Sequence, residues 1–126
     1  MILDAATERI QIALGGTVTA NQLDLYSAWV DHTASPYSYT PGNTQDDSDN
    51  TNQVDVVPPP AASTQRQAKL ISIYNADTVS ATVTVSFYDG TNRRTLFVAT
   101  LATLEQLIWE PGYGWRIYEA DGTVKA

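Results

Sequence analysis

The stretch Ala81-Thr82-Val83-Thr84-Val85-Ser86-Phe87-Tyr88 decides the fold class of this chain. It places Val83, Val85 and Phe87 on one face and threonines on the other, which is the two-residue period of a half-buried β-strand. Asp89-Gly90 follows as a hairpin-turn signal, and the residues from 94 to 101 return as a second strand. The pattern therefore predicts an antiparallel pair.

The same alternation recurs along the rest of the chain. Ile10, Ile12 and Leu14 share one face before Gly15-Gly16 ends the segment, and further strands are expected at 54–57, 69–75, 104–109 and 115–118. Strands at intervals of about ten residues, with turn dipeptides between them, are typical of an antiparallel sandwich or barrel. We predict an all-β, antiparallel β-sandwich of jelly-roll type at residues 8–126, preceded by an extended N-terminal arm at residues 1–7.

Two segments are less regular. Apolar residues on both parities of 23–33 indicate a strand that is covered on both sides or carries a bulge. A helix over 21–29, capped by Asn21, is the alternative, and the β context on either side favours the strand. Residues 34–53 are rich in Ser, Thr, Asn, Asp, Gly and Pro, so we predict one long acidic polar loop there.

Composition excludes several functional classes. The 126 residues include no cysteine, which rules out disulfides, thiol nucleophiles and cysteine-ligated zinc. Fourteen acidic residues against seven basic ones give a net charge of -7, and residues 21–60 hold six acids and no base. An acidic chain repels phosphate backbones, so no nucleic-acid partner is expected. No apolar run approaches the roughly 18 residues of a membrane span, so no membrane partner is expected either.

Catalytic and metal-binding patterns are poorly represented. The single histidine, His32, follows Asp31, and neighbours on a strand point to opposite faces, so Asp31 cannot orient it as a catalytic triad would. We expect no enzyme activity and no cofactor. Asp47 and Asp49 alternate as calcium ligands do, but Asn52 stands where the calcium loop needs glycine. Asp47 and Asp49 are therefore only weak candidates for cation ligands, and we expect their carboxylates to be solvated rather than bound to an ion.

The aromatic residues near the C-terminus allow two interpretations. Trp109 and Trp115 flank the turn at 110–114, and Tyr113 lies at its tip. Exposed aromatic rings on loops stack on sugars or anchor protein interfaces. The other interpretation is that Trp109 and Trp115 pair across a hairpin and fill the end of the sandwich.

Much of the chain resembles small β-sandwich virion proteins of tailed bacteriophages. The resemblance rests on Ile10-x-Ile12-x-Leu14-Gly15-Gly16, Thr19-Ala20-Asn21-Gln22-Leu23, Ser72-Ile73-Tyr74-Asn75-Ala76-Asp77, Ala81-Thr82-Val83-Thr84-Val85, Thr100-Leu101-Ala102, Glu105-Gln106-Leu107, Gly114-Trp115 and Asp121-Gly122. The loop at 34–53 is less typical, and Leu104 stands where the pattern commonly has glycine.

The resemblance implies a head decoration, or cement, protein located at the capsid surface. Such a protein stabilises the outside of the shell, and its partners would be the major capsid protein and copies of itself, as a homotrimer. An extended N-terminal arm could add a strand to a neighbouring chain. The candidate interface residues are Ile2, Leu3, Tyr37, Tyr39 and Tyr113. The alternative is a tail-fibre or head-fibre module that binds host glycans through loop aromatics.

Overall fold

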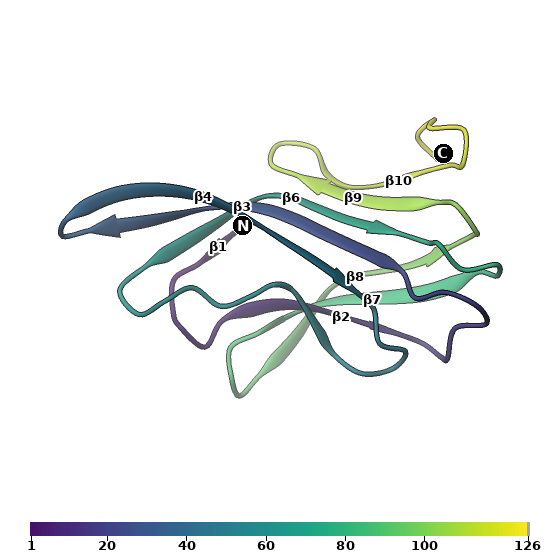
Figure 1. Cartoon of the computed structure of the whole chain (residues 1–126), viewed down its shortest axis with the longest axis horizontal. Coiled ribbons are helices and arrows are strands. Elements are labelled where there is room, and N and C mark those ends of the chain that lie inside the picture. The colour runs from purple at the N-terminus through teal and green to yellow at the C-terminus, as the bar shows by residue number, and fades with distance from the viewer. Residues whose placement is uncertain (126) are drawn as a thin grey trace.

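Two antiparallel sheets pack face to face in the structure, a computed structural model that describes residues 1–125 (Figure 1). The strands are β1 (Ile2–Leu3), β2 (Arg9–Leu14), β3 (Asp24–Ala34), β4 (Tyr37–Asp47), β5 (Val54–Val57), β6 (Gln65–Tyr74), β7 (Ala81–Tyr88), β8 (Arg93–Leu101), β9 (Gln106–Glu110) and β10 (Gly114–Tyr118). The predicted all-β antiparallel sandwich is confirmed. Within these residues, no helix is long and apolar enough to cross a membrane.

The larger sheet has six strands and the smaller has four. The order in the larger sheet is β10-β9-β6-β3-β4, with β1 beside one end of β6, and the order in the smaller sheet is β5-β2-β7-β8. Three neighbouring pairs, β3–β4, β7–β8 and β9–β10, are consecutive hairpins. This order departs from the eight-stranded, double Greek-key arrangement of a jelly roll.

The core lies between the two sheets and consists of the inward parity of each strand. Ile10, Ile12 and Val85 are fully buried there, as the alternation predicts. From the larger sheet, Ile71, Ile73 and Leu107 meet them. The strand predicted within 23–33 is confirmed as β3, and the helix alternative is wrong. Its register shifts between Ala28 and Trp29, which confirms the expected bulge.

The predicted polar loop at 34–53 is wrong over most of its length. Tyr37–Asp47 forms β4, which pairs with β3 along all eleven residues and completes a hairpin that projects from the body of the sandwich (Figure 1). An exposed edge strand needs no alternation of apolar and polar residues, so the polar composition of this segment did not indicate a strand. Of the predicted loop, only the Ser35-Pro36 turn and the residues from 48 to 53, in which Asp49 pairs with Asn52, lie outside the strands.

The N-terminal arm is also placed differently from the prediction. Ile2 and Leu3 pair with Gln67 and Arg66 of the chain's own β6, beyond the end of β9. Leu3 is fully buried in the core, so it is not an interface residue. The arm fills an open length of its own sheet because unpaired backbone groups on β6 would otherwise remain there.

Leu104 adopts the left-handed backbone conformation, with φ at +66°. This is the region that glycine enters without steric cost and that a leucine side chain disfavours. The turn before β9 therefore keeps the conformation expected of a glycine, although leucine occupies the position.

Candidate binding surface

Three of the five predicted interface residues lie on the same outward face of the larger sheet, with Tyr37 and Tyr39 near the projecting end of the β3–β4 hairpin and Ile2 on β1. Tyr37 is 76 % exposed, Tyr39 is 58 % exposed and Ile2 is 57 % exposed. The sheet register explains why they share this face. Pro41 pairs with Val30, Val30 with Gln67, and Gln67 with Ile2, while Tyr39 and Tyr37 pair with the next two outward residues of β3, His32 and Ala34.

Because paired residues share a face, these side chains lie on the side of the larger sheet that points away from the core. We call the group formed by Ile2, His32, Tyr37, Tyr39 and Pro41 the hairpin-end surface. With histidine counted as neutral, the only charged side chain between residues 30 and 41 is that of Asp31. The hairpin-end surface is therefore aromatic and free of formal charge, unlike the acidic remainder of residues 21–60.

A cavity of about 450 Å³ lies at one side of this surface. Three segments meet there: the residue after β1, the end of the β3–β4 hairpin, and the start of β6. The lining residues are Asp4, His32, Thr33, Ala34, Tyr37, Ser63, Thr64 and Gln65. The cavity thus combines one aromatic ring, an imidazole, a carboxylate, an amide and several hydroxyl groups.

The polar groups in the cavity are not linked to one another through His32. The imidazole ring of His32 is held edge-on against Tyr39, with 5.1 Å between ring centres. Within residues 1–125, no hydrogen bond joins His32 to Asp4 or to Ser63, and an activated serine requires such bonds. What the lining offers is hydrogen-bonding groups beside an exposed ring.

A largely buried ion pair between Arg66 and Asp31 holds the hairpin on the inward face of the larger sheet. Arg66 donates two hydrogen bonds to the carboxylate of Asp31, from Nε to Oδ1 at 2.8 Å and from Nη2 to Oδ2 at 2.9 Å. Its Nη1 donates to the carbonyl of Pro58 at 2.8 Å, and its guanidinium lies 3.5 Å from the ring centre of Trp29. This two-pronged contact fixes the direction of β3 relative to β6 and to the proline segment.

Gly42 provides room for the ring of Trp29. A Cβ atom at Gly42 would lie 2.3 Å from that ring, so only glycine lets β4 run beneath it. The indole Nε1 donates to Thr44 Oγ1 at 3.3 Å. These contacts were not predicted because the sequence does not show that residues 29 and 42 are partners across a hairpin.

The aromatic residues at the β9–β10 turn divide into two roles. Trp115 pairs in register with Trp109 and stacks on Phe97 at 5.5 Å, which confirms the core interpretation for these tryptophans. Tyr113 is 64 % exposed, and the guanidinium of Arg116 lies 4.5 Å from its ring centre. Since β10 and β4 lie at opposite edges of the sheet, Tyr113 is not part of the hairpin-end surface.

The candidate cation ligands Asp47 and Asp49 are not brought into a metal-binding group. Asp47 ends β4, and Asp49 accepts a hydrogen bond from Asn52 at 3.1 Å. Among residues 1–125, no three acidic, histidine or cysteine side chains are placed to hold a metal ion.

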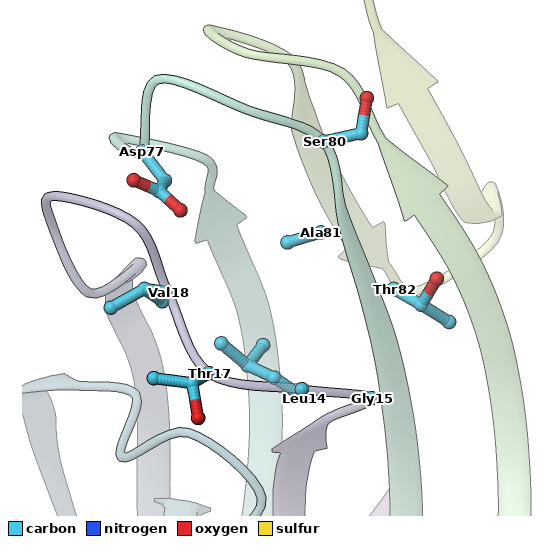
Figure 2. A pocket seen from close by; sticks show the side chains of 9 residues that line it. Leu14, Gly15, Thr17, Val18, Asp77, Ser80, Ala81 and Thr82 are labelled. Atoms are coloured by element: carbon cyan, nitrogen blue, oxygen red, sulfur yellow. The ribbon is translucent and has the colours of Figure 1, made fainter.

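The sequence did not predict a hydrogen-bonded polar cluster around Asp77, at the end of the sandwich away from the hairpin tip. Asp77, only 2 % exposed, accepts hydrogen bonds from the backbone N–H groups of Thr19 at 2.9 Å, Ala20 at 2.8 Å and Asn21 at 3.2 Å. Figure 2 shows its carboxylate turned toward the 17–18 segment, beside a cavity of about 240 Å³. The carboxylate of Asp77 joins the β2–β3 connection to the β6–β7 connection, so this hydrogen-bonded cluster has a structural role.

These backbone hydrogen bonds, that of Thr19 above all, lower the pKa of Asp77 from its ordinary 3.8 to about 2. The bonds favour the charged form in the folded state only, so their contribution to stability is complete above about pH 4 and is lost as the pH falls toward 2. We expect the stability difference between the wild type and Asp77→Asn to shrink over that interval. Urea unfolding at several pH values measures it, and a constant difference would contradict the assignment.

No family model matches the chain, and neither the curated proteins nor the solved structures contain a match to it.

Proposed function

We propose that the chain is a structural virion protein of a tailed bacteriophage that attaches to the outside of the capsid and stabilises it. The resemblance suggests this class, and the hairpin-end surface is the observation that carries the proposal. Exposed aromatic clusters on a monomer mark protein interaction sites, and tyrosine is enriched at the centres of such interfaces. No catalytic role is proposed.

The shape and charge of the molecule support attachment through this end. The hairpin projects from the sandwich, so its tip can reach a neighbouring surface while the two sheets stay clear of it (Figure 1). The uncharged hairpin-end surface can be buried without stranding a charge, because Asp31 is already paired with Arg66 on the other face. The acidic remainder would stay in solvent and oppose unwanted association.

The test is binding of the purified chain to phage particles that lack it, measured by co-sedimentation. The double variant Tyr37→Ala, Tyr39→Ala is expected to bind about 100-fold more weakly, because each tyrosine at an interface centre contributes about 1–2 kcal/mol. Tyr113→Ala is the matched control, since its exposure is similar and it lies at the opposite edge of the sheet. Equal binding by the double variant and the wild type would refute attachment through this end.

A saccharide-binding role is the second candidate, and the cavity beside Tyr37 favours it. An exposed tyrosine ring can cover the C–H face of a sugar, while the carboxylate of Asp4 and the amide of Gln65 can bind its hydroxyl groups. Trp115 is partly buried against the core, stacks on Phe97 and lies at the opposite edge of the sheet, so it is not beside this cavity. A glycan array tests this candidate. A signal on the array that Gln65→Ala removes, together with no co-sedimentation of the wild type with particles, would favour saccharide binding over capsid attachment.

A further inference from the structure

Two arginine side chains of this protein are held by the same kinds of contact, but only one of them has an acidic partner. Arg66 uses Nη1 to bond neutral acceptors, the carbonyl groups of Pro58 at 2.8 Å and Pro59 at 3.4 Å. Its guanidinium lies over the ring of Trp29, and its Nε and Nη2 donate to the carboxylate of Asp31. Arg66 thus shows what a guanidinium fixed in this way does with its remaining edge: it holds a carboxylate.

Arg93 repeats the first two of these contacts on the outer face of the smaller sheet. Its Nη1 donates to Gln11 Oε1 at 2.7 Å and to Ser86 Oγ at 3.0 Å. The same nitrogen lies 3.1 Å from Gln53 Oε1, and the guanidinium lies 4.5 Å from the ring centre of Tyr88. The third contact is missing, because within residues 1–125 no hydrogen bond starts from Nε or Nη2 of Arg93 and no ion pair includes it.

The sheet register builds this arrangement. Arg93 begins β8 opposite Tyr88 of β7, and in the next row on this face Ser86 of β7 lies opposite Gln11 of β2. Gln11 and Ser86 are buried although they belong to an outer face. The amide nitrogen of Gln11 donates to Asp55 Oδ1 at 2.7 Å, which turns the amide oxygen toward Arg93. The guanidinium is therefore held by neighbours that are themselves fixed.

The positive charge of Arg93 is not neutralised by these neighbours. The second carboxylate oxygen of Asp55 lies 3.5 Å from Nη1 of Arg9 and makes no ion pair with Arg93 in the part of the chain that the structure describes. The Nε and Nη2 atoms of a guanidinium present two parallel N–H groups, which match the two oxygens of a carboxylate. Arg93 is exposed, whereas the side chain of Arg66 is 9 % exposed, so a group from outside the chain can reach it.

We propose that Arg93 is a binding site for one carboxylate group, presented by an aspartate or glutamate side chain of a partner protein. The carboxylate accepts hydrogen bonds from Nε and Nη2, as that of Asp31 does from Arg66. Water hydrates these two donors in the free protein, and the carboxylate replaces it with charge-assisted hydrogen bonds. The site lies on the smaller sheet, so it is separate from the hairpin-end surface on the larger sheet.

Two observations favour a protein over other carriers of negative charge. Leu96 and Val98 lie further along the same strand and are 38 % and 55 % exposed, and exposed apolar side chains near an arginine are typical of protein interfaces. The chain has a net charge of -7, which repels a polyanion such as a nucleic acid or an acidic polysaccharide. A protein surface that places a single carboxylate at Arg93 avoids most of this repulsion.

The test is an NMR titration of the full chain with sodium acetate, in which chloride is exchanged for acetate at constant ionic strength. The Nε–H signals of Arg93 and Arg116 are followed in the same sample. Arg116 is the matched control, because its guanidinium also lies 4.5 Å from a tyrosine ring, that of Tyr113, but makes no side-chain hydrogen bond within residues 1–125. Arg93 is expected to bind acetate about fivefold more tightly than Arg116, since an anchored side chain loses less freedom on binding.

Three further probes identify the carrier of the carboxylate: a peptide with one glutamate between two leucines, the same peptide with glutamine in its place, and sodium glucuronate. The glutamate peptide is expected to shift the Arg93 signal and to bind more tightly than glucuronate, and the glutamine peptide is expected to leave that signal unchanged. Arg93→Lys is expected to weaken binding of the glutamate peptide about fivefold, because an ammonium group cannot form two parallel bonds. The backbone N–H signals of Ser86 and Tyr88 report binding in this variant.

Equal acetate affinities of Arg93 and Arg116 would overturn the proposal, as would a response to the glutamine peptide equal to that to the glutamate peptide. A glucuronate affinity equal to or above that of the glutamate peptide would overturn the protein partner and identify a sugar acid instead. The titrations of the wild type decide the proposal even if Arg93→Lys does not fold. They use no phage particle, so their result is independent of the particle-binding test.

Discussion

Replacing Arg66 by alanine is expected to lower the free energy of unfolding by about 3–5 kcal/mol, the cost of leaving one partner of a buried pair uncompensated. The Arg66 side chain is 9 % exposed and that of Asp31 is 21 % exposed, so water replaces the lost contact poorly. The variant also leaves the ring of Trp29 uncovered and the carbonyl of Pro58 without its donor. Equilibrium unfolding in urea measures the loss.

Arg9→Ala is the control for this effect. Arg9 approaches Asp55 at 3.5 Å, but both side chains are about three-tenths exposed, so its loss is expected to cost less than about 1 kcal/mol. Arg66→Lys should fall between the two, because an ammonium group cannot form the two-pronged contact with Asp31. If Arg66→Ala cost no more than Arg9→Ala, the ion pair would not fix the hairpin.

Leu3→Ala is expected to cost about 3 kcal/mol, within a range of about 2–5 kcal/mol for a buried leucine. Leu3 is fully buried between the sheets, although it stands only three residues from the N-terminus. The adjacent Ile2 faces solvent, so Ile2→Ala should change stability by less than about 0.5 kcal/mol. Thermal unfolding of Leu3→Ala and Ile2→Ala compares two neighbouring substitutions on opposite faces of the same strand.

The contrasting result is also informative. If both variants were as stable as the wild type, the first residues would lie outside the core, and the arm would be free to pair with a neighbouring chain. If Leu3→Ala alone is destabilised, any loss of particle binding on deletion of residues 1–7 reflects damage to the sandwich as well as to a contact.

The strands in which apolar and polar residues alternate could be predicted from the sequence. Ile10, Ile12 and Val85 are in the core because a half-buried strand must place apolar side chains at every second position. β4 escaped prediction because its inward positions, such as Gly42 and Thr44, lie against Trp29 rather than against the aliphatic core. An edge strand of this kind is recognised only once its partner strand is known.

Only part of the hairpin-end surface was predicted: Ile2, Tyr37 and Tyr39 were candidate interface residues, whereas His32 and Pro41 were not. Tyr37 and Tyr39 are the only aromatic residues of the polar segment 34–53, and this composition fits their exposure. Their position on the same face as Ile2 depends on the register of β1, β6, β3 and β4, which no local pattern specifies. Asp77 follows the strand expected at 69–75, and its role as an acceptor for three residues of another loop depends on tertiary contact.

The pairing of β3 on both of its sides has a mechanical consequence. β4 bonds to it from Asp24 to Ala34 and β6 bonds to it from Asp24 to His32, so a pull on the projecting tip is directed along the strand axis. Such a load is shared by many hydrogen bonds at once, and they must fail together in shear rather than open one after another. A hairpin paired in this way resists a pulling force better than a loop of equal length.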